Sequence, residues 1–345
     1  MAVAKMRAGM LCAALVLAAE SVSAGNWADV GGPADPAFLH SKALCRSLKR
    51  MPVQAAGPDE TASLPGTCSS EALYYGIGMP ANPALAFRCA LRERNHADDR
   101  SLFSGDVMLM TMYANGVGAP RDLERAIALA CEIDGAPAEV SGRVDHLASL
   151  RDQHWQGHDF SYCDDITSGA GQGFCAAHDA ALADQARKTR IEAVASGWTG
   201  KEKQAFLTLR KAEQAFIDAR AAHEVDMSGT ARAAMAINEE QAQQEDFLAL
   251  LQQLEAGTIA PSTAADLSTA DDKLNAVYRR VQQTPETILW GTVTRADIRA
   301  AERAWLAYRD AWVAFARVRY PHVSPESVAT ALTEKRTAML EAFAS

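Results

Sequence analysis

The chain has 345 residues, with 34 basic and 43 acidic side chains and a formal net charge of −9. Nucleic acids and anionic membrane surfaces favour proteins with basic patches, so this balance argues against both as partners. The same balance would suit a cationic protein partner, although an excess of acidic residues is also a common means of staying soluble.

Residues 1–24 have the composition of a cleavable secretory signal peptide. Lys5 and Arg7 supply a positive start, residues 8–19 form an apolar run, and small residues occupy 22–24. We therefore expect cleavage after Ala24 and export of the remaining chain. The run is shorter than the about 20 residues needed to cross a bilayer, and no second apolar segment reaches that length, so no membrane span is predicted.

Six cysteines follow the predicted leader, and an even number of cysteines in an exported chain indicates a disulfide framework. All six lie between residues 45 and 175, whereas the last 170 residues contain none. This asymmetry predicts two halves of different construction. The framework predicts an oxidising compartment, for which the bacterial periplasm is the simplest choice. The disulfide candidates are Cys45, Cys68, Cys89, Cys131, Cys163 and Cys175.

A repeat with a period of 40 residues marks the first half and pairs Gly76 with Gly116 and Asn82 with Asp122. Glycine permits a positive φ at a helix exit, and Asn or Asp caps the start of the next helix. The repeat therefore predicts two helical hairpins, each with a glycine turn. The aligned segments are "YGIGMPANPALA" (75–86) and "NGVGAPRDLERA" (115–126).

The second hairpin resembles a Sel1-like repeat, a helical-hairpin relative of the tetratricopeptide repeat. The resemblance implies a short α-solenoid over residues 40–155, of a kind that mostly binds proteins. Cys68 begins the first helix of one hairpin and Cys89 ends its second, so antiparallel packing predicts a Cys68–Cys89 disulfide. The residues that carry the resemblance are Tyr113, Gly116, Gly118, Asp122 and Ala126.

A second repeat, with a period near 90 residues, marks the alanine-rich second half. "LRKAEQAFIDAR" (209–220) aligns with "IRAAERAWLAYR" (298–309), which pairs Phe216 with Trp305. Upstream, "HDAALADQ" aligns in the same way with "ADDKLNAV". The pattern predicts a helical unit of about 90 residues that occurs twice.

Strong helix formers dominate from about residue 176, and neither alternating β-branched runs nor two-residue Asn-Gly hairpins occur. The sequence therefore predicts an all-α protein, in which a short tetratricopeptide-like α-solenoid precedes a duplicated helical-hairpin bundle. A Thr-, Ala-, Pro- and Ser-rich stretch at 256–268 is typical of a linker. The expected boundaries are 1–24 for the leader, 25–155 for the disulfide-bonded repeat region, 156–256 for the first helical unit and 257–345 for the second.

An aromatic stripe in the second unit is either core or a binding face. On a helix its members follow one another at alternating steps of three and four residues, so they face one way. Because Phe216 replaces Trp305 in the other repeat, the position needs a large ring rather than a particular chemical group. We therefore predict burial against helices at 271–283 and 328–343. The stripe contains Ile298, Ala301, Trp305, Tyr308, Trp312 and Phe315, and Arg319 continues the same spacing.

Three segments of the second unit, "ADDKLNAVYRRV", "AAERAWLAYRDAWVAF" and "TEKRTAML", carry a composite motif. This motif resembles that of the LprI-like lysozyme inhibitors, a family of exported bacterial helical domains, over residues 160–345. The resemblance implies that Cys163 and Cys175 are the family's disulfide pair. The motif residues are Asp272, Leu274, Asn275, Tyr278, Glu302, Arg303, Trp305, Leu306, Tyr308, Arg309, Thr333 and Arg336.

The chain departs from the family pattern in two places. Related domains often carry cysteines where this sequence has Trp312 and the residues near Ala331, and Ala219 stands at the position of Tyr308 in the first unit. The unit must therefore hold together by packing. Arg309 and Arg336 are predicted to pair with carboxylates inside the bundle, since motif arginines often do so.

The resemblance implies an exported protein that binds and blocks a lysozyme or another peptidoglycan hydrolase. The target would be either a host lysozyme or a competitor's toxin, and in the second case the protein would be an immunity protein. The alternative is a non-inhibitory envelope scaffold that binds partner proteins through its solenoid. An inhibitor should act through residues 160–345, and a scaffold through residues 40–155.

The remaining polar residues do not indicate catalysis. His154, His158 and His178 lie near two cysteines, as in a zinc site, but cysteines in an oxidising compartment favour disulfides. Paired carboxylates at 164–165 and 271–272 are more typical of helix N-terminal charge than of acid–base chemistry. The sequence contains no Gly-x-Ser-x-Gly elbow and no phosphate-binding loop. We predict a binding protein without catalytic residues, metal or cofactor.

Overall fold

A computed structural model describes residues 25–344, except for 32–34, 53–63, 65–66, 95–101 and 286–289. The predicted leader over residues 1–24 and its cleavage site lie outside the described residues. Within them every regular element is a helix and no strand occurs, which confirms the predicted all-α class. The α-helices are α1 (Leu39–Leu48), α3 (Ser70–Tyr75), α4 (Pro83–Arg94), α5 (Gly105–Asn115), α6 (Leu123–Ala130), α7 (Pro137–Asp152), α8 (Gly169–Ala195), α9 (Gly200–His223), α10 (Arg232–Ala256), α11 (Ala264–Gln283), α12 (Arg295–Arg319) and α13 (Pro325–Glu341).

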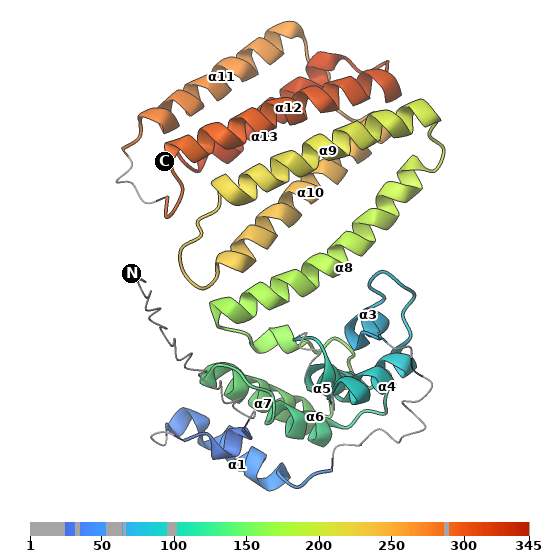
Figure 1. The fold of residues 1–345 in the computed structure, drawn as a ribbon, viewed down its shortest axis with the longest axis vertical. Coiled ribbons are helices and arrows are strands. Elements are labelled where there is room, and N and C mark those ends of the chain that lie inside the picture. The colour runs from blue at the N-terminus through green and yellow to red at the C-terminus, as the bar shows by residue number, and fades with distance from the viewer. Residues whose placement is uncertain are drawn as a thin grey trace, which may run out of the picture.

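The helices form two groups joined by α8. Figure 1 shows α1 to α7 gathered at one end of the molecule and α9 to α13 at the other, with the long α8 between them. The buried apolar side chains follow the same division, since one core extends along the chain from Trp27 to Cys175 and the other from Trp198 to Leu340. Phe160 and Tyr162, which lie beyond the predicted boundary at 155, pack into the first core.

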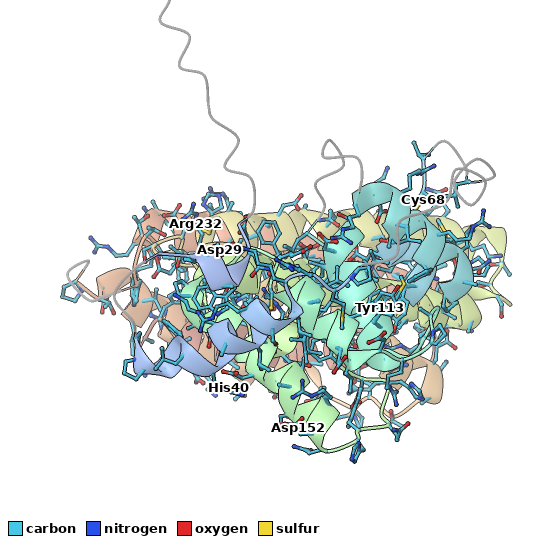
Figure 2. All side chains as sticks on the ribbon, turned by 90° about the horizontal axis from the view of Figure 1, so that it is seen from below. Asp29, His40, Cys68, Tyr113, Asp152 and Arg232 are labelled. Atoms are coloured by element: carbon cyan, nitrogen blue, oxygen red, sulfur yellow. A yellow bond between two sulfur atoms is a disulfide. The ribbon has the colours of Figure 1, made fainter. Side chains whose placement is uncertain are left out.

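Two helical hairpins, α3–α4 and α5–α6, stand where the period-40 repeat predicts them. Gly76 and Gly116 end their first helices in the left-handed region, with φ of 78° and 64°. Asn82 and Asp122 each accept a hydrogen bond from the backbone N–H three residues further on, at 3.1 and 3.0 Å. Tyr113, within the N-terminal helices in Figure 2, is only 2% exposed. That these hairpins are Sel1-like repeats stays a prediction.

All six cysteines that follow the predicted leader are paired. The predicted Cys68–Cys89 disulfide is confirmed, as is the Cys163–Cys175 disulfide that the family resemblance implies. The sequence did not predict the third pairing. This disulfide joins Cys45 on α1 to Cys131 at the end of α6, across 86 residues. The framework therefore ties α1 to the second hairpin as well as closing the first.

Replacing Cys45 and Cys131 together by alanine should destabilise the protein more than replacing Cys163 and Cys175. The first disulfide closes a separation of 86 residues and the second one of 12, and a longer closed loop removes more entropy from the unfolded chain. We expect a difference of about 2 kcal/mol in the free energy of unfolding. Urea unfolding of both double variants, followed by circular dichroism, measures it. Equal losses would contradict the loop-length argument.

In the C-terminal group, α8 packs on α10, α11 packs on α13, and α9 packs along α12. The last pair is antiparallel. His223, at the end of α9, forms an ion pair of 2.8 Å with Asp297 at the start of α12, while Phe206 near the start of α9 lies against Phe315. The two helices that align in the period-90 repeat therefore face each other. This arrangement supports a duplicated unit, which stays a prediction.

The aromatic stripe of α12 is core, because all six of its members are at most 7% exposed. The predicted neighbours contribute, since Leu274 of α11 and Leu340 of α13 belong to the same core. Aromatic rings of α9 and α10 also contact the stripe. Phe216 of α9 stacks on Tyr308 with ring centroids 5.2 Å apart, and Phe247 of α10 lies 4.8 Å from Trp312. The first helical unit therefore supplies much of the surface that buries the stripe.

Candidate functional site

The helices that carry the motif begin at local sequence signals. Thr263 and Asp266 form a capping box at the start of α11, and Thr294 and Asp297 form one at the start of α12. Ser324 caps α13 and is followed by proline at the first helical position, where the missing N–H has no cost. These signals place the three helices, and their packing then divides the motif residues into buried and exposed sets.

Arg336 is the centre of a buried ion network. Its guanidinium is fully buried and donates hydrogen bonds of 2.9 and 2.5 Å to Glu224 and one of 2.9 Å to Glu302. Arg220 donates a further bond of 2.7 Å to Glu224. Burial alone would lower the pKa of Arg336, but the hydrogen bonds to Glu224 hold this pKa above its usual value. Arg336 therefore stays charged and joins α13 to α12 and to the end of α9.

Arg309 makes a second internal connection. Its Nη1 lies 3.0 Å from Asp271 Oδ1, and the Thr333 hydroxyl donates to the same oxygen at 3.3 Å. The guanidinium also lies 5.0 Å from the ring centroid of Trp305, within the range of a cation–π contact. Helices α11, α12 and α13 are thus held together by Asp271 and by the motif side chains of Arg309 and Thr333. The predicted internal pairing of Arg309 and Arg336 is confirmed.

A groove of about 390 Å³ lies between α11 and α12, and it collects most of the motif residues. Leu274 and Trp305 form its buried floor. Asn275 and Arg303 are exposed along it, and Leu306 has 41% of its surface accessible. The motif residues in the groove lining are Leu274, Asn275, Tyr278, Glu302, Arg303, Trp305, Leu306 and Arg309.

Arg303 differs from the other two motif arginines, Arg309 and Arg336, in its hydrogen bonding. It forms no hydrogen bond or ion pair with any residue that the structure describes, whereas Arg299, one turn earlier, donates to Gln282 Oε1 at 2.8 Å. A guanidinium that forms no hydrogen bond or ion pair with the described residues is free to bind a carboxylate of a partner with two parallel hydrogen bonds. In the predicted period-90 repeat Gln214 aligns with Arg303, so of these two positions the one in the α11–α12 groove carries the guanidinium.

The histidines and cysteines considered as a zinc site are dispersed in the structure. Cys163 and Cys175 are bonded to each other, and His178 Nδ1 donates to Glu71 Oε1 at 2.6 Å while the imidazole stacks on Phe103. Among the described residues, no group of three or more His, Cys, Asp or Glu side chains could hold a metal ion. None of the described helices is long and apolar enough to cross a membrane.

The fold and the groove together define an all-helical, disulfide-bonded protein in which most of the exposed motif residues line one groove of the C-terminal bundle. The family model described as "Lysozyme inhibitor LprI" matches residues 252–340, from the end of α10 through α13. A search of curated proteins and a search of solved structures each find no match. The predicted resemblance is therefore confirmed for residues 252–340, and its extension to the first helical unit stays a prediction.

Proposed function

We propose that this protein is an exported, non-enzymatic inhibitor of a lysozyme or another peptidoglycan hydrolase, and that it acts through the α11–α12 groove. The observation that carries the proposal is Arg303, a motif residue within the segment matched by the inhibitor family, exposed on a rigid helix and without a partner among the described residues. The three disulfides support export to an oxidising compartment such as the periplasm.

The chemistry of the target suggests how such a group would inhibit. Glycosidases that cut peptidoglycan typically place two carboxyl groups on either side of the scissile bond. Arg303 would pair with one of them, and the neighbouring Leu306 would cover apolar surface of the substrate cleft. Both positions lie on a helix whose opposite face is buried, so little backbone entropy is lost on binding, and the main entropic cost is that of ordering the two side chains. Substrate would then be excluded sterically.

Replacing Arg303 by alanine should weaken inhibition of a sensitive muramidase at least about tenfold, because arginines at interface centres are frequent hot spots. The measurement is a titration of the oxidised protein against peptidoglycan digestion. Arg317→Ala is the matched control, since Arg317 is exposed on the same helix about 21 Å further along. Circular dichroism establishes that both variants are folded.

Different results separate the proposal from its alternative. Unchanged inhibition by Arg303→Ala would place the inhibitory surface outside the groove. A folded wild-type protein that inhibits none of several muramidases would contradict the inhibitor function and favour an envelope scaffold that binds partners through residues 40–155. Inhibition restricted to a toxin from a competing bacterium would favour an immunity protein.

A further inference from the structure

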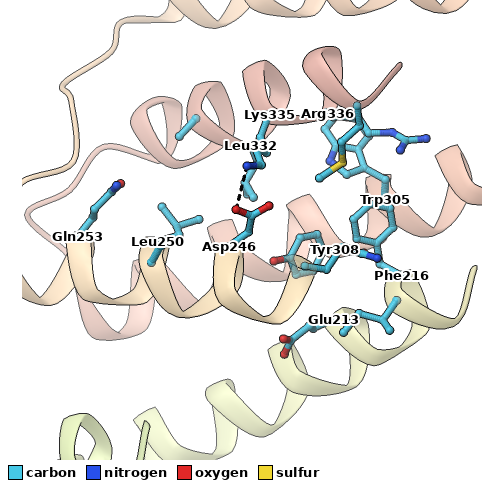
Figure 3. A pocket seen from close by; sticks show the side chains of 15 residues that line it. Glu213, Phe216, Asp246, Leu250, Gln253, Trp305, Tyr308, Leu332, Lys335 and Arg336 are labelled. Carbon is cyan, nitrogen blue, oxygen red and sulfur yellow. Dashed lines mark hydrogen bonds and ion pairs between the residues drawn. The ribbon is translucent and has the colours of Figure 1, made fainter. Parts of the chain in front are cut away.

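A second concave site lies within the C-terminal bundle, between α9, α10, α12 and α13. Figure 3 shows its lining, with Phe216, Trp305 and Tyr308 on one side and the Asp246–Lys335 pair on another. Its volume is about 230 Å³. Cavities of about 150 Å³ hold benzene, whereas drug-sized ligands need about 300 Å³ or more, so the space suits one ring with a short side chain. Only Trp305 also lines the α11–α12 groove.

Two buried acceptors in this lining have no hydrogen-bond partner among the described residues. They are Oε1 of Glu213 and Oε1 of Gln243, and the two residues are 2% and 5% exposed. A buried polar atom without a partner costs about 1–3 kcal/mol. Such atoms are rare in folded proteins, and where they line a cavity they indicate a missing donor.

The cationic side chains of the lining are already engaged. All three hydrogen-bonding nitrogens of Arg336 are directed to Glu224 and Glu302, and Lys335 pairs with Asp246 at 2.8 Å. Arg210 binds the other oxygen of Glu213, Oε2, at 2.5 Å and leaves Oε1 without a donor. The cavity therefore combines an apolar, aromatic wall with two buried oxygen atoms that accept no hydrogen bond from the described residues.

We propose that this cavity binds a small organic amine. The apolar body of the ligand would lie among Phe216, Leu250 and Tyr308, and its ammonium group would donate to Glu213 and Gln243. An anion would meet unpaired acceptors and is disfavoured, and a hydrocarbon would leave both acceptors unsatisfied.

The ionisation of Glu213 gives the site a pH dependence. Burial raises the pKa of Glu213 to about 8, against the opposing effects of Arg210 and Arg187. Below that pH the empty site holds a neutral carboxyl group, so an ammonium ligand must displace a proton. Affinity should therefore increase about tenfold for each pH unit up to about 8 and then level off. The charged or titratable groups around Glu213 are Arg187 of α8, Arg210 of α9, Asp246 of α10, Tyr308 of α12, and Lys335 and Arg336 of α13.

Isothermal titration of the oxidised, leader-free protein with 2-phenylethylamine at pH 6, 7 and 8 tests this proposal. We expect binding that tightens with pH and releases a proton at pH 6 and 7. 2-Phenylethanol, which has the same ring and a neutral donor, should bind more weakly, and 3-phenylpropionate should not bind. No heat from the amine at any pH, or equal affinity for all three probes, would overturn the proposal.

Two variants locate the binding. Glu213→Gln keeps the shape of the side chain and should weaken amine binding at pH 8 about tenfold or more, while removing its pH dependence. Ala249→Trp places a large ring at an exposed position of the cavity lining and should block entry of the ligand. Ala242→Trp is its control, because Ala242 is exposed on the same helix but lies outside the lining. Wild-type affinity in Ala249→Trp, or unchanged affinity in a folded Glu213→Gln, would show that the amine binds elsewhere.

Discussion

Replacing Arg336 by alanine should lower the free energy of unfolding by about 3–5 kcal/mol. The side chain is fully buried, and its removal leaves Glu302 without its cationic partner and Glu224 with Arg220 alone. The cost is that of uncompensated buried charge, which greatly exceeds the net contribution of an exposed ion pair. Urea unfolding at neutral pH, followed by circular dichroism, measures it.

Lys335, the residue before Arg336 in the chain, provides the matched control. Its ion pair with Asp246 is 2.8 Å long, but the two side chains are 52% and 39% exposed. Lys335→Ala should therefore cost no more than about 1 kcal/mol. If the two alanine variants were equally stable, the buried network of Arg336 would not be what holds α13 in place.

Replacing Trp312 by alanine should cost about 3–5 kcal/mol, because it opens a large cavity in the C-terminal core. The indole is 0% exposed and contacts the rings of Phe247, Tyr308 and Phe315. Thermal and urea unfolding would both show the loss. Since α9 and α10 bury the same rings, we expect unfolding of the whole C-terminal bundle to shift as one transition.

Trp312→Phe separates packing from hydrogen bonding at this position. The indole Nε1 has no hydrogen-bond partner among the described residues, so its removal costs no bond. The smaller ring should therefore lose only part of the packing energy, well below the alanine variant. A phenylalanine variant as unstable as the alanine variant would indicate that the indole N–H has a partner in solution.

Short-range features of this protein follow from its sequence alone. Glycine turns, side-chain caps and helix periodicity act within a few residues, so the all-α class and the two hairpins of the first half could be predicted. The Cys68–Cys89 disulfide spans 21 residues within one hairpin and followed from the same features, whereas the Cys163–Cys175 disulfide, which spans 12, was expected from the family resemblance. Burial of the α12 stripe also followed, because its spacing places all six members on one helix face.

Long-range relations were decided only by the tertiary structure. Cys45 meets Cys131 across 86 residues, and Arg336 meets Glu224 across 112. No local pattern predicts such partners, because they depend on how α9 packs against α12 and on where α13 then lies. The same packing leaves Glu213 beside a cavity and Arg303 in a groove, although both are charged residues on similar amphipathic helices. Their difference in environment, and hence in proposed role, arises from which helix faces meet in three dimensions.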